Sequence, residues 1–237
     1  MNIFHTQDFD TELGYLDIYD RYPELLPFVG KDFKSMEQKV LMLGESHYLP
    51  EKSTIHNDAM NWYNDNSTSL SEEEKDWLNT RNAINARSGQ RLVNKAYTIH
   101  HNLEKSIMNA GFYPDENDNL FRYFVYYNYF LRPAQTGISI DRKHIDKEKS
   151  FYHLNVIIDY LKIDIVIFSS VMAYKDFNWF YETYNCLTQA KIYCVPHASS
   201  SHWNKEVKKY QNENGSSLTG REYFESILRR HEISQPR

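Results

Sequence analysis

Cysteine is scarce in this sequence of 237 residues, and its two cysteines, Cys186 and Cys194, already exclude several classes of protein. Two thiols cannot form a disulfide framework or the four-thiolate site of an iron-sulfur cluster, and no Cys-x-x-Cys spacing occurs. Ten histidines are present, but no His-Glu-x-x-His pattern accompanies them. We therefore expect buried thiols, no iron-sulfur cluster, no other cofactor and no catalytic metal.

Long apolar runs are also missing. No stretch of 18 apolar residues occurs, and the amino terminus lacks the basic start and apolar core of a signal peptide. We expect a cytoplasmic protein without a membrane partner. The net charge of −5 argues against a strong binder of duplex nucleic acid, because such binding depends on Lys and Arg neutralising phosphates. Two basic clusters are expected to be solvated helix faces. They are Lys205, Lys208 and Lys209, and Arg221, Arg229 and Arg230.

The remaining pattern is that of strands alternating with helices. An apolar content of 41% suffices for one α/β domain over residues 1–237. Strands are expected at 39–43, 123–130, 164–169 and 191–195, and helices at 90–109, 151–161, 172–187 and from Thr219 onward. This alternation predicts a three-layer α/β/α sandwich around a central, mainly parallel, four-stranded sheet. The polar residues 50–88, with a helix starting at Ser71, are expected to form an insertion over the site.

Four separated segments carry the candidate chemistry. They are Gly44 to Tyr48, Asn128 to Pro133, Asp164 to Ala173, and Pro196 to Ser201. The first and last follow short apolar strands directly. Open α/β sheets place their ligand crevice beyond the carboxyl ends of such strands, so the polar residues of these segments are expected to meet at one edge of the sheet.

The first segment resembles the motif of uracil-DNA glycosylases, in which a strand ends in a loop Gly-Gln-Asp-Pro-Tyr or Gly-Glu-Ala-Pro-Gly. Here the loop is Gly44-Glu45-Ser46-His47-Tyr48. Gly44 and Glu45 match the second form and Tyr48 the first, whereas Ser46 and His47 replace the family's Asp and Pro. The resemblance implies a base pocket lined by Gly44, His47 and Tyr48. Glu45 is then the nearest substitute for the catalytic carboxylate, and Ser46 is the residue at its usual place.

The other segments extend the resemblance over roughly residues 39–203. Asn128 matches the Asn that reads the base edge, and Arg132 with Pro133 matches the Arg-Pro pair that follows it. The segment 164–173 resembles a strand and helix start that scaffold the sheet. The last segment resembles the loop His-Pro-Ser-Pro, whose His donates to a base carbonyl.

In this last loop His197 is the expected donor, and Ala198 replaces Pro. Ser199 and Ser200 are the expected substrate contacts. Catalysis is therefore assigned to Glu45, Ser46 and His197. Each residue also has a simpler explanation when taken alone, such as a helix cap, a buried histidine or a turn.

The resemblance implies a protein that binds an extruded uracil or another deaminated base in single-stranded or duplex DNA and hydrolyses its N-glycosidic bond. Two alternatives stay open from the sequence. One is a noncatalytic nucleobase-binding or nucleic-acid-binding module of the same fold, and the other is a hydrolase of a small nucleoside-like metabolite. Loops of the form Gly-Glu-x-His also occur in unrelated hydrolases and haem-binding proteins, which lack the other segments.

Overall fold

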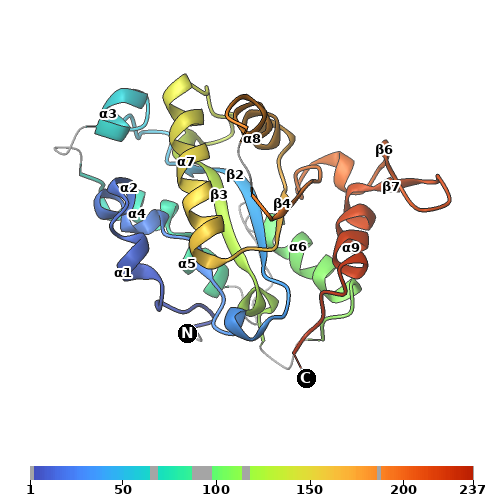
Figure 1. Ribbon diagram of the computed structural model, residues 1–237. Helices are drawn as coiled ribbons and strands as arrows, with labels where there is room; N and C mark the ends of the chain where they lie inside the picture. The colour runs from blue at the N-terminus through green and yellow to red at the C-terminus, as the bar shows by residue number, and fades with distance from the viewer. Residues whose placement is uncertain (1–2, 65–68, 87–97, 114–117, 186–187, 237) are drawn as a thin grey trace.

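A central sheet organises the computed structural model, which describes residues 3–64, 69–86, 98–113, 118–185 and 188–236. Within these residues the sheet has five strands in the order β1-β3-β2-β4-β5 (Figure 1). The strands are β1 (Phe28–Val29), β2 (Val40–Leu49), β3 (Val125–Gln135), β4 (Ile165–Phe168) and β5 (Lys191–Cys194). The last four run parallel, and β1 pairs antiparallel with β3. The expected sheet of four strands is therefore corrected to a mixed sheet of five. The additional strand β1 has only two residues and directly follows Pro27, so it is too short to show a strand pattern in the sequence.

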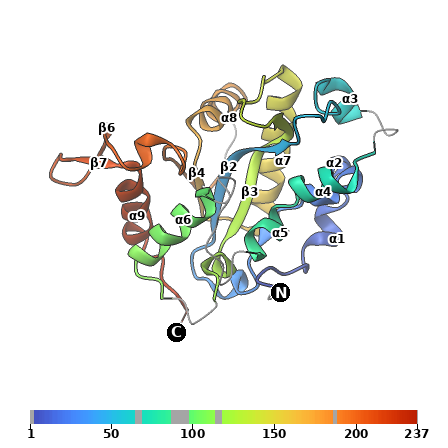
Figure 2. The same cartoon turned by 180° about the vertical axis from the view of Figure 1, so that it is seen from behind.

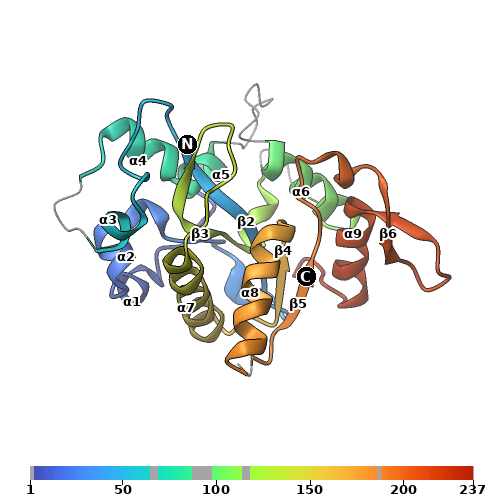
Figure 3. The same cartoon turned by 90° about the horizontal axis from the view of Figure 1, so that it is seen from above.

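Helices cover both faces of this sheet. On one face α7 (His144–Leu161) and α8 (Val171–Thr183) pack over β3 and β4. On the other face lie α6 (Thr98–Asn109) and α9 (Gly220–Arg230), which pack against each other (Figures 2 and 3). The side chains of β2 alternate between the two cores, with Leu41 and Leu43 in one and Val40 and Met42 in the other. This two-sided burial explains the near-continuous apolar runs of the parallel strands.

The expected helices agree with the structure in place and differ in their ends. The run at 90–109 corresponds to α6, and its first part lies outside the described residues. Thr219 and Glu222 form the predicted capping box of α9, which buries Phe224, Ile227 and Leu228. Several shorter helical segments connect these elements. They are α1 (Asp10–Leu13), α2 (Asp17–Arg21), η1 (Pro23–Leu25), η2 (Phe33–Ser35), η4 (Leu120–Tyr123) and η5 (Ser201–Trp203).

The polar segment 50–88 holds α3 (Ala59–Asn64), α4 (Glu72–Leu78) and α5 (Thr80–Asn85). Ser71 and Glu74 form the capping box expected at the start of α4. Trp62 and Leu78 anchor this segment in the same core as α7 and α8. None of its described residues lines the cavity described below, so the expected cover over the site is not found there.

A β-hairpin replaces the first of the two expected basic helix faces. Its strands β6 (Glu206–Gln211) and β7 (Ser217–Thr219) pair antiparallel, apart from the main sheet, and the hairpin projects from the body of the protein next to α9 (Figure 1). Its turn runs from Asn212 to Gly215 and is closed by a hydrogen bond from the Gly215 N–H to the Asn212 carbonyl, with Gly215 at a φ of 78°. Lys208 and Lys209 therefore lie on a strand. None of the described helices is long and apolar enough to cross a membrane.

Candidate functional site

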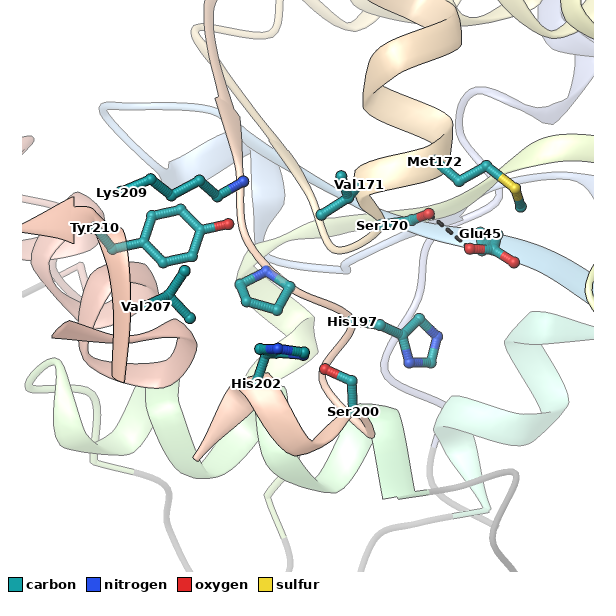
Figure 4. A pocket seen from close by; sticks show the side chains of 11 residues that line it. Glu45, Ser170, Val171, Met172, His197, Ser200, His202, Val207, Lys209 and Tyr210 are labelled. Carbon is teal, nitrogen blue, oxygen red and sulfur yellow. Dashed lines mark hydrogen bonds between the residues drawn. The ribbon is translucent and has the colours of Figure 1, made fainter. Parts of the chain in front are cut away.

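A cavity of about 400 Å³ opens beyond the carboxyl ends of β4 and β5, beside the second half of β2 (Figure 4). Its polar lining comes from four separate parts of the chain. These residues are Glu45 of β2, Ser170 before α8, His197, Ser200 and His202 after β5, and Lys209 and Tyr210 of the hairpin. Open parallel sheets commonly hold their ligands at this edge. Two of the three expected catalytic residues, Glu45 and His197, thus share one cavity.

Glu45 lies within a strand, which corrects the expected loop at 44–48. β2 continues to Leu49 because the long strand β3 pairs with it from Leu41 to Leu49, with an irregularity between Ser46 and Tyr48. β4 pairs with β2 only as far as Leu43. Beyond that point β2 has no strand on the β4 side, and the Glu45 side chain contacts Ser170 at the start of α8.

The carboxylate of Glu45 is held by one hydrogen bond. The Ser170 hydroxyl donates to Glu45 Oε2 over 2.7 Å, and the same hydroxyl accepts the backbone N–H of Ala173 at 3.2 Å. Ser170 is therefore both the N-cap of α8 and the positioning contact of Glu45. The amino terminus of a helix also attracts negative charge. The other oxygen, Oε1, has no hydrogen-bond partner among the described residues and remains available to a water or a ligand.

Ser169, the residue before Ser170, supports the loop that follows β5. Ser169 Oγ accepts the backbone N–H of Ala198 at 3.2 Å, and Asn102 of α6 donates to the carbonyl of Ala198 at 2.7 Å. Ala198 is fully buried in the core under α6. The loop that follows β5 is thus fixed on both sides although it lacks the proline of the family motif.

His197 is held as a neutral ring with a defined donor. Burial lowers its pKa, and the nearby charge of Glu45 offsets this only in part. The backbone N–H of Ser199 approaches Nδ1 at 3.4 Å and the Ser199 hydroxyl at 2.8 Å. Because a backbone N–H can only donate, Nδ1 is an acceptor and Nε2 carries the proton. His197 therefore presents its Nε2–H group as a donor. Ser199 is exposed, and its backbone N–H and hydroxyl both contact Nδ1 of the ring.

Asn128 lies on the neighbouring strand and does not line the cavity. It is paired with Gly44, and a β-carbon at Gly44 would overlap both Asn128 Oδ1 and the Tyr126 hydroxyl. Alternation along β2 places Gly44 and Ser46 on the face toward α6, opposite to Glu45. The Asn128 amide has no hydrogen-bond partner among the described residues. Ser46 Oγ is buried and likewise has none in the described part of the chain.

Arg132 is engaged elsewhere. Its guanidinium forms two hydrogen bonds to Asp146, at 2.8 and 2.7 Å, and donates to the backbone carbonyls of His56 and Asp141. Both charged side chains of this pair are almost completely buried. The structure therefore gives Arg132 the role of joining β3 to the start of α7, and it does not bring this residue to the cavity as a substrate contact.

His47 and Tyr48 differ in exposure and also lie outside the cavity lining. The His47 side chain is buried, and this burial lowers its pKa to about 4. Tyr48 is 38% exposed, and burial together with the charge of Glu45 raises its pKa. Glu45 thus acts electrostatically on both Tyr48 and His197. His47 has the environment of a core residue.

Sequence reasoning missed four polar residues of the cavity, which are Ser170, His202, Lys209 and Tyr210. Ser170 had a readable signal, because a serine directly after a buried strand is a common helix N-cap. The Asn214-Gly215 pair, which indicates a hairpin turn, could have moved Lys209 from a helix to a strand. His202 had no comparable signal, since it follows an irregular loop.

The described residues contain no group of three His, Cys, Asp or Glu side chains that could hold a metal ion. Cys194, at the end of β5, is a half-buried free thiol, and Cys186 lies outside the described residues. The fold and cavity together define an α/β protein with a polar site at the carboxyl edge of a mostly parallel sheet. In comparisons with known proteins, no family model and no curated protein matched the sequence.

Proposed function

We propose that this protein is a divergent relative of the uracil-DNA glycosylases, which accepts an extruded nucleobase and hydrolyses the N-glycosidic bond between the base and its sugar. One observation carries the proposal: Glu45 and His197 face one cavity with complementary roles. The carboxylate has an unused oxygen, and the neutral imidazole has an unused N–H. Water activation and leaving-group stabilisation require this pair of groups.

The order of the sequence segments along the sheet supports the same family. The segments that contain Gly44, Asn128 and Asp164 lie on or beside three adjacent parallel strands, and the segment of His197 follows the fourth. Segments that were matched in sequence order alone thus fall at corresponding positions of neighbouring strands. An unrelated Gly-Glu-x-His loop gives no reason for this arrangement.

In the proposed reaction Glu45 Oε1 orients a water toward the sugar carbon that bears the base. The bond from this carbon to the base nitrogen breaks while the water oxygen adds, and the carboxylate takes up a proton from the water. His197 donates its Nε2–H to a carbonyl of the leaving base, where negative charge develops. A half-buried neutral imidazole suits this role because it stabilises the charge without an initial salt bridge to Glu45.

Asn128 is assigned to base recognition from the α6 face of the sheet. Its amide carries one acceptor and two donors, which match a carbonyl and a ring N–H on the edge of a base. Gly44 lets the amide lie against the backbone of β2. Ser46 has no carboxylate to offer, so Glu45, on the opposite face of the same strand, is the carboxylate of the proposed mechanism. The base would then reach across Gly44, where β2 no longer pairs with β4, with its sugar on the Glu45 side.

The test uses oligonucleotides with a single uracil, hypoxanthine or xanthine, as single strands and as duplexes, followed by alkaline scission of abasic sites. Glu45→Gln keeps the shape of the side chain, and His197→Asn keeps a polar one. We expect each variant to lower base release at least about 100-fold, as the loss of one acid-base or oxyanion-stabilising group does. Glu51→Gln and His101→Gln are the matched controls, because both residues are exposed and lie outside the cavity.

Base release that is equal in the wild type and in both site variants would reject the catalytic proposal. A free base or oligonucleotide that raises the melting temperature without any base release would instead indicate a noncatalytic binding module. Release of base from free nucleosides, but not from DNA, would move the activity to a small metabolite.

A further inference from the structure

The first turn of α9 lies against two walls of the cavity. One wall is the loop after β5, which carries Pro196, His197 and His202, and the other is the hairpin with Tyr210 (Figure 4). Tyr223, at the end of this turn, stacks on Tyr210 with ring centroids 4.5 Å apart. The first residue of the helix is a buried glycine, and it is this glycine that meets the loop.

Gly220 approaches the loop at a distance that excludes a side chain. A β-carbon at this position would lie 2.6 Å from both Cγ and Cδ of Pro196 and 3.1 Å from the backbone carbonyl oxygen of His202. Carbon atoms in contact are normally about 3.5–4.0 Å apart. The ring of Pro196 cannot rotate away, because it is closed on the backbone. Only a glycine therefore allows α9 to begin so close to the loop.

The same loop is fixed two residues after Pro196. The backbone of Ala198 is held on both sides, by Ser169 Oγ at 3.2 Å and by the Asn102 amide at 2.7 Å. One contact comes from the segment between β4 and α8, and the other comes from α6. A displacement of Pro196 is therefore taken up by His197, the single residue between Pro196 and the fixed Ala198.

We propose that Gly220 is a positioning residue of the site, because it lets α9 lie directly against Pro196 and thereby sets the place of the His197 ring in the cavity. The inference rests on the proposed function, in which His197 donates to the leaving base. Packing against the helix supplies the rigidity that a proline at the position of Ala198 would give. A displaced ring costs rate more than substrate affinity, because its donor must meet a charge that develops only in the transition state.

The test is a double-mutant cycle of Gly220→Ala and Pro196→Ala. Pro196→Ala removes Cγ and Cδ, the two atoms that a β-carbon at position 220 would meet. We expect Gly220→Ala to lower kcat for base release about tenfold in the wild-type background and less than about twofold beside Pro196→Ala, with KM changed less than about threefold in either. Equal losses of kcat in the two backgrounds would overturn the proposal.

A second readout needs no substrate. The ring signals of His197 in proton NMR spectra are assigned from their loss in His197→Asn. Gly220→Ala should shift these signals in the wild-type background and leave them in place beside Pro196→Ala. Unchanged signals in Gly220→Ala would overturn the proposal. Shifted signals in a protein that releases no base would instead mean failure of the proposed function alone.

Gly111→Ala is the control for a general loss of stability. Gly111 has a φ of 113°, which strains any other residue, and its added methyl group would meet nothing within 4 Å. This variant should keep kcat and the His197 signals of the wild type. If Gly220→Ala alone does not fold, a double variant that folds with the His197 signals of Pro196→Ala supports the contact, and a double variant that also fails to fold contradicts it.

Discussion

Acid should destabilise this protein through His47, and the size of the effect can be worked out from its burial. The His47 side chain is 7% exposed, makes no hydrogen bond among the described residues, and its pKa falls from 6.5 to about 4 because burial disfavours the charged ring. Between these two pH values the unfolded chain binds a proton at this residue and the folded protein does not. The free energy of unfolding therefore falls as the pH drops from 6.5 to 4.

Each pKa unit corresponds to about 1.4 kcal/mol, so the loss from His47 amounts to about 3 kcal/mol at pH 4. Other groups titrate in the same range, and comparison with His47→Gln removes their contribution. We expect the stability difference between the wild type and His47→Gln to shift by about 3 kcal/mol toward the variant between pH 7 and pH 4. Urea unfolding followed by tryptophan fluorescence measures this, since Trp62 and Trp203 are buried.

His101→Gln controls for the loss of one histidine, because the His101 side chain on α6 is exposed. A stability difference between the wild type and His47→Gln that stays constant within about 1 kcal/mol from pH 7 to pH 4 would refute the reasoning. His47 would then be accessible to protons and water in the folded state. In that case its position in the expected base pocket would regain support.

Three further predictions follow from contacts around the site. Ser170→Ala should lower the free energy of unfolding by about 1–2 kcal/mol, measured by urea unfolding, because the helix cap is lost. In steady-state kinetics the same variant should reduce kcat for base release more than it raises KM. Ser170→Thr should restore both the stability and kcat. Gly44→Ala should displace the Asn128 amide and the Tyr126 hydroxyl and raise the Kd for a free base about tenfold in a titration. Arg132→Met should cost about 3–5 kcal/mol in urea unfolding, because it leaves Asp146 charged and buried without a partner, and a loss below about 1 kcal/mol would contradict the structural role of Arg132.

The parallel strands and their helices were predictable because burial on both faces leaves a strong sequence pattern. Ile165 to Phe168 are all buried, and the apolar run in the sequence covers the same residues. The second half of β2 was not predictable in this way. Its residues Gly44 to His47 are polar or small, which is typical of a loop, and only the pairing with the long strand β3 keeps them in a strand. Pairing between distant segments overrode the local pattern there.

The candidate site was predictable in part, for the same reason. Glu45 and His197 follow apolar runs that the sequence shows, and the parallel order of strands brings them to one edge. Their supports, Ser169 and Ser170, had been assigned to scaffolding alone. Arg132 matched a motif, but its partner Asp146 lies on the following helix, and no sequence pattern indicates that these two residues form a pair. The position of Asn128 was not predictable either, because the side of the sheet that it faces depends on its pairing with Gly44 of β2.

The unequal lengths of β2 and β4 connect the fold to the chemistry. β4 ends at Phe168, and the chain then turns into α8, so the Ser170 hydroxyl and the amino terminus of the helix fill the space that a longer strand would have occupied. Glu45 is the first residue of β2 beyond the last pair with β4 that faces this space. A longer β4 would move the start of α8, and the Ser170 hydroxyl would no longer lie beside the carboxylate. The same shortening lets the loop after β5 cross over Ser169 and carry His197 to the cavity. The position of the two candidate catalytic residues thus follows from where one buried strand ends.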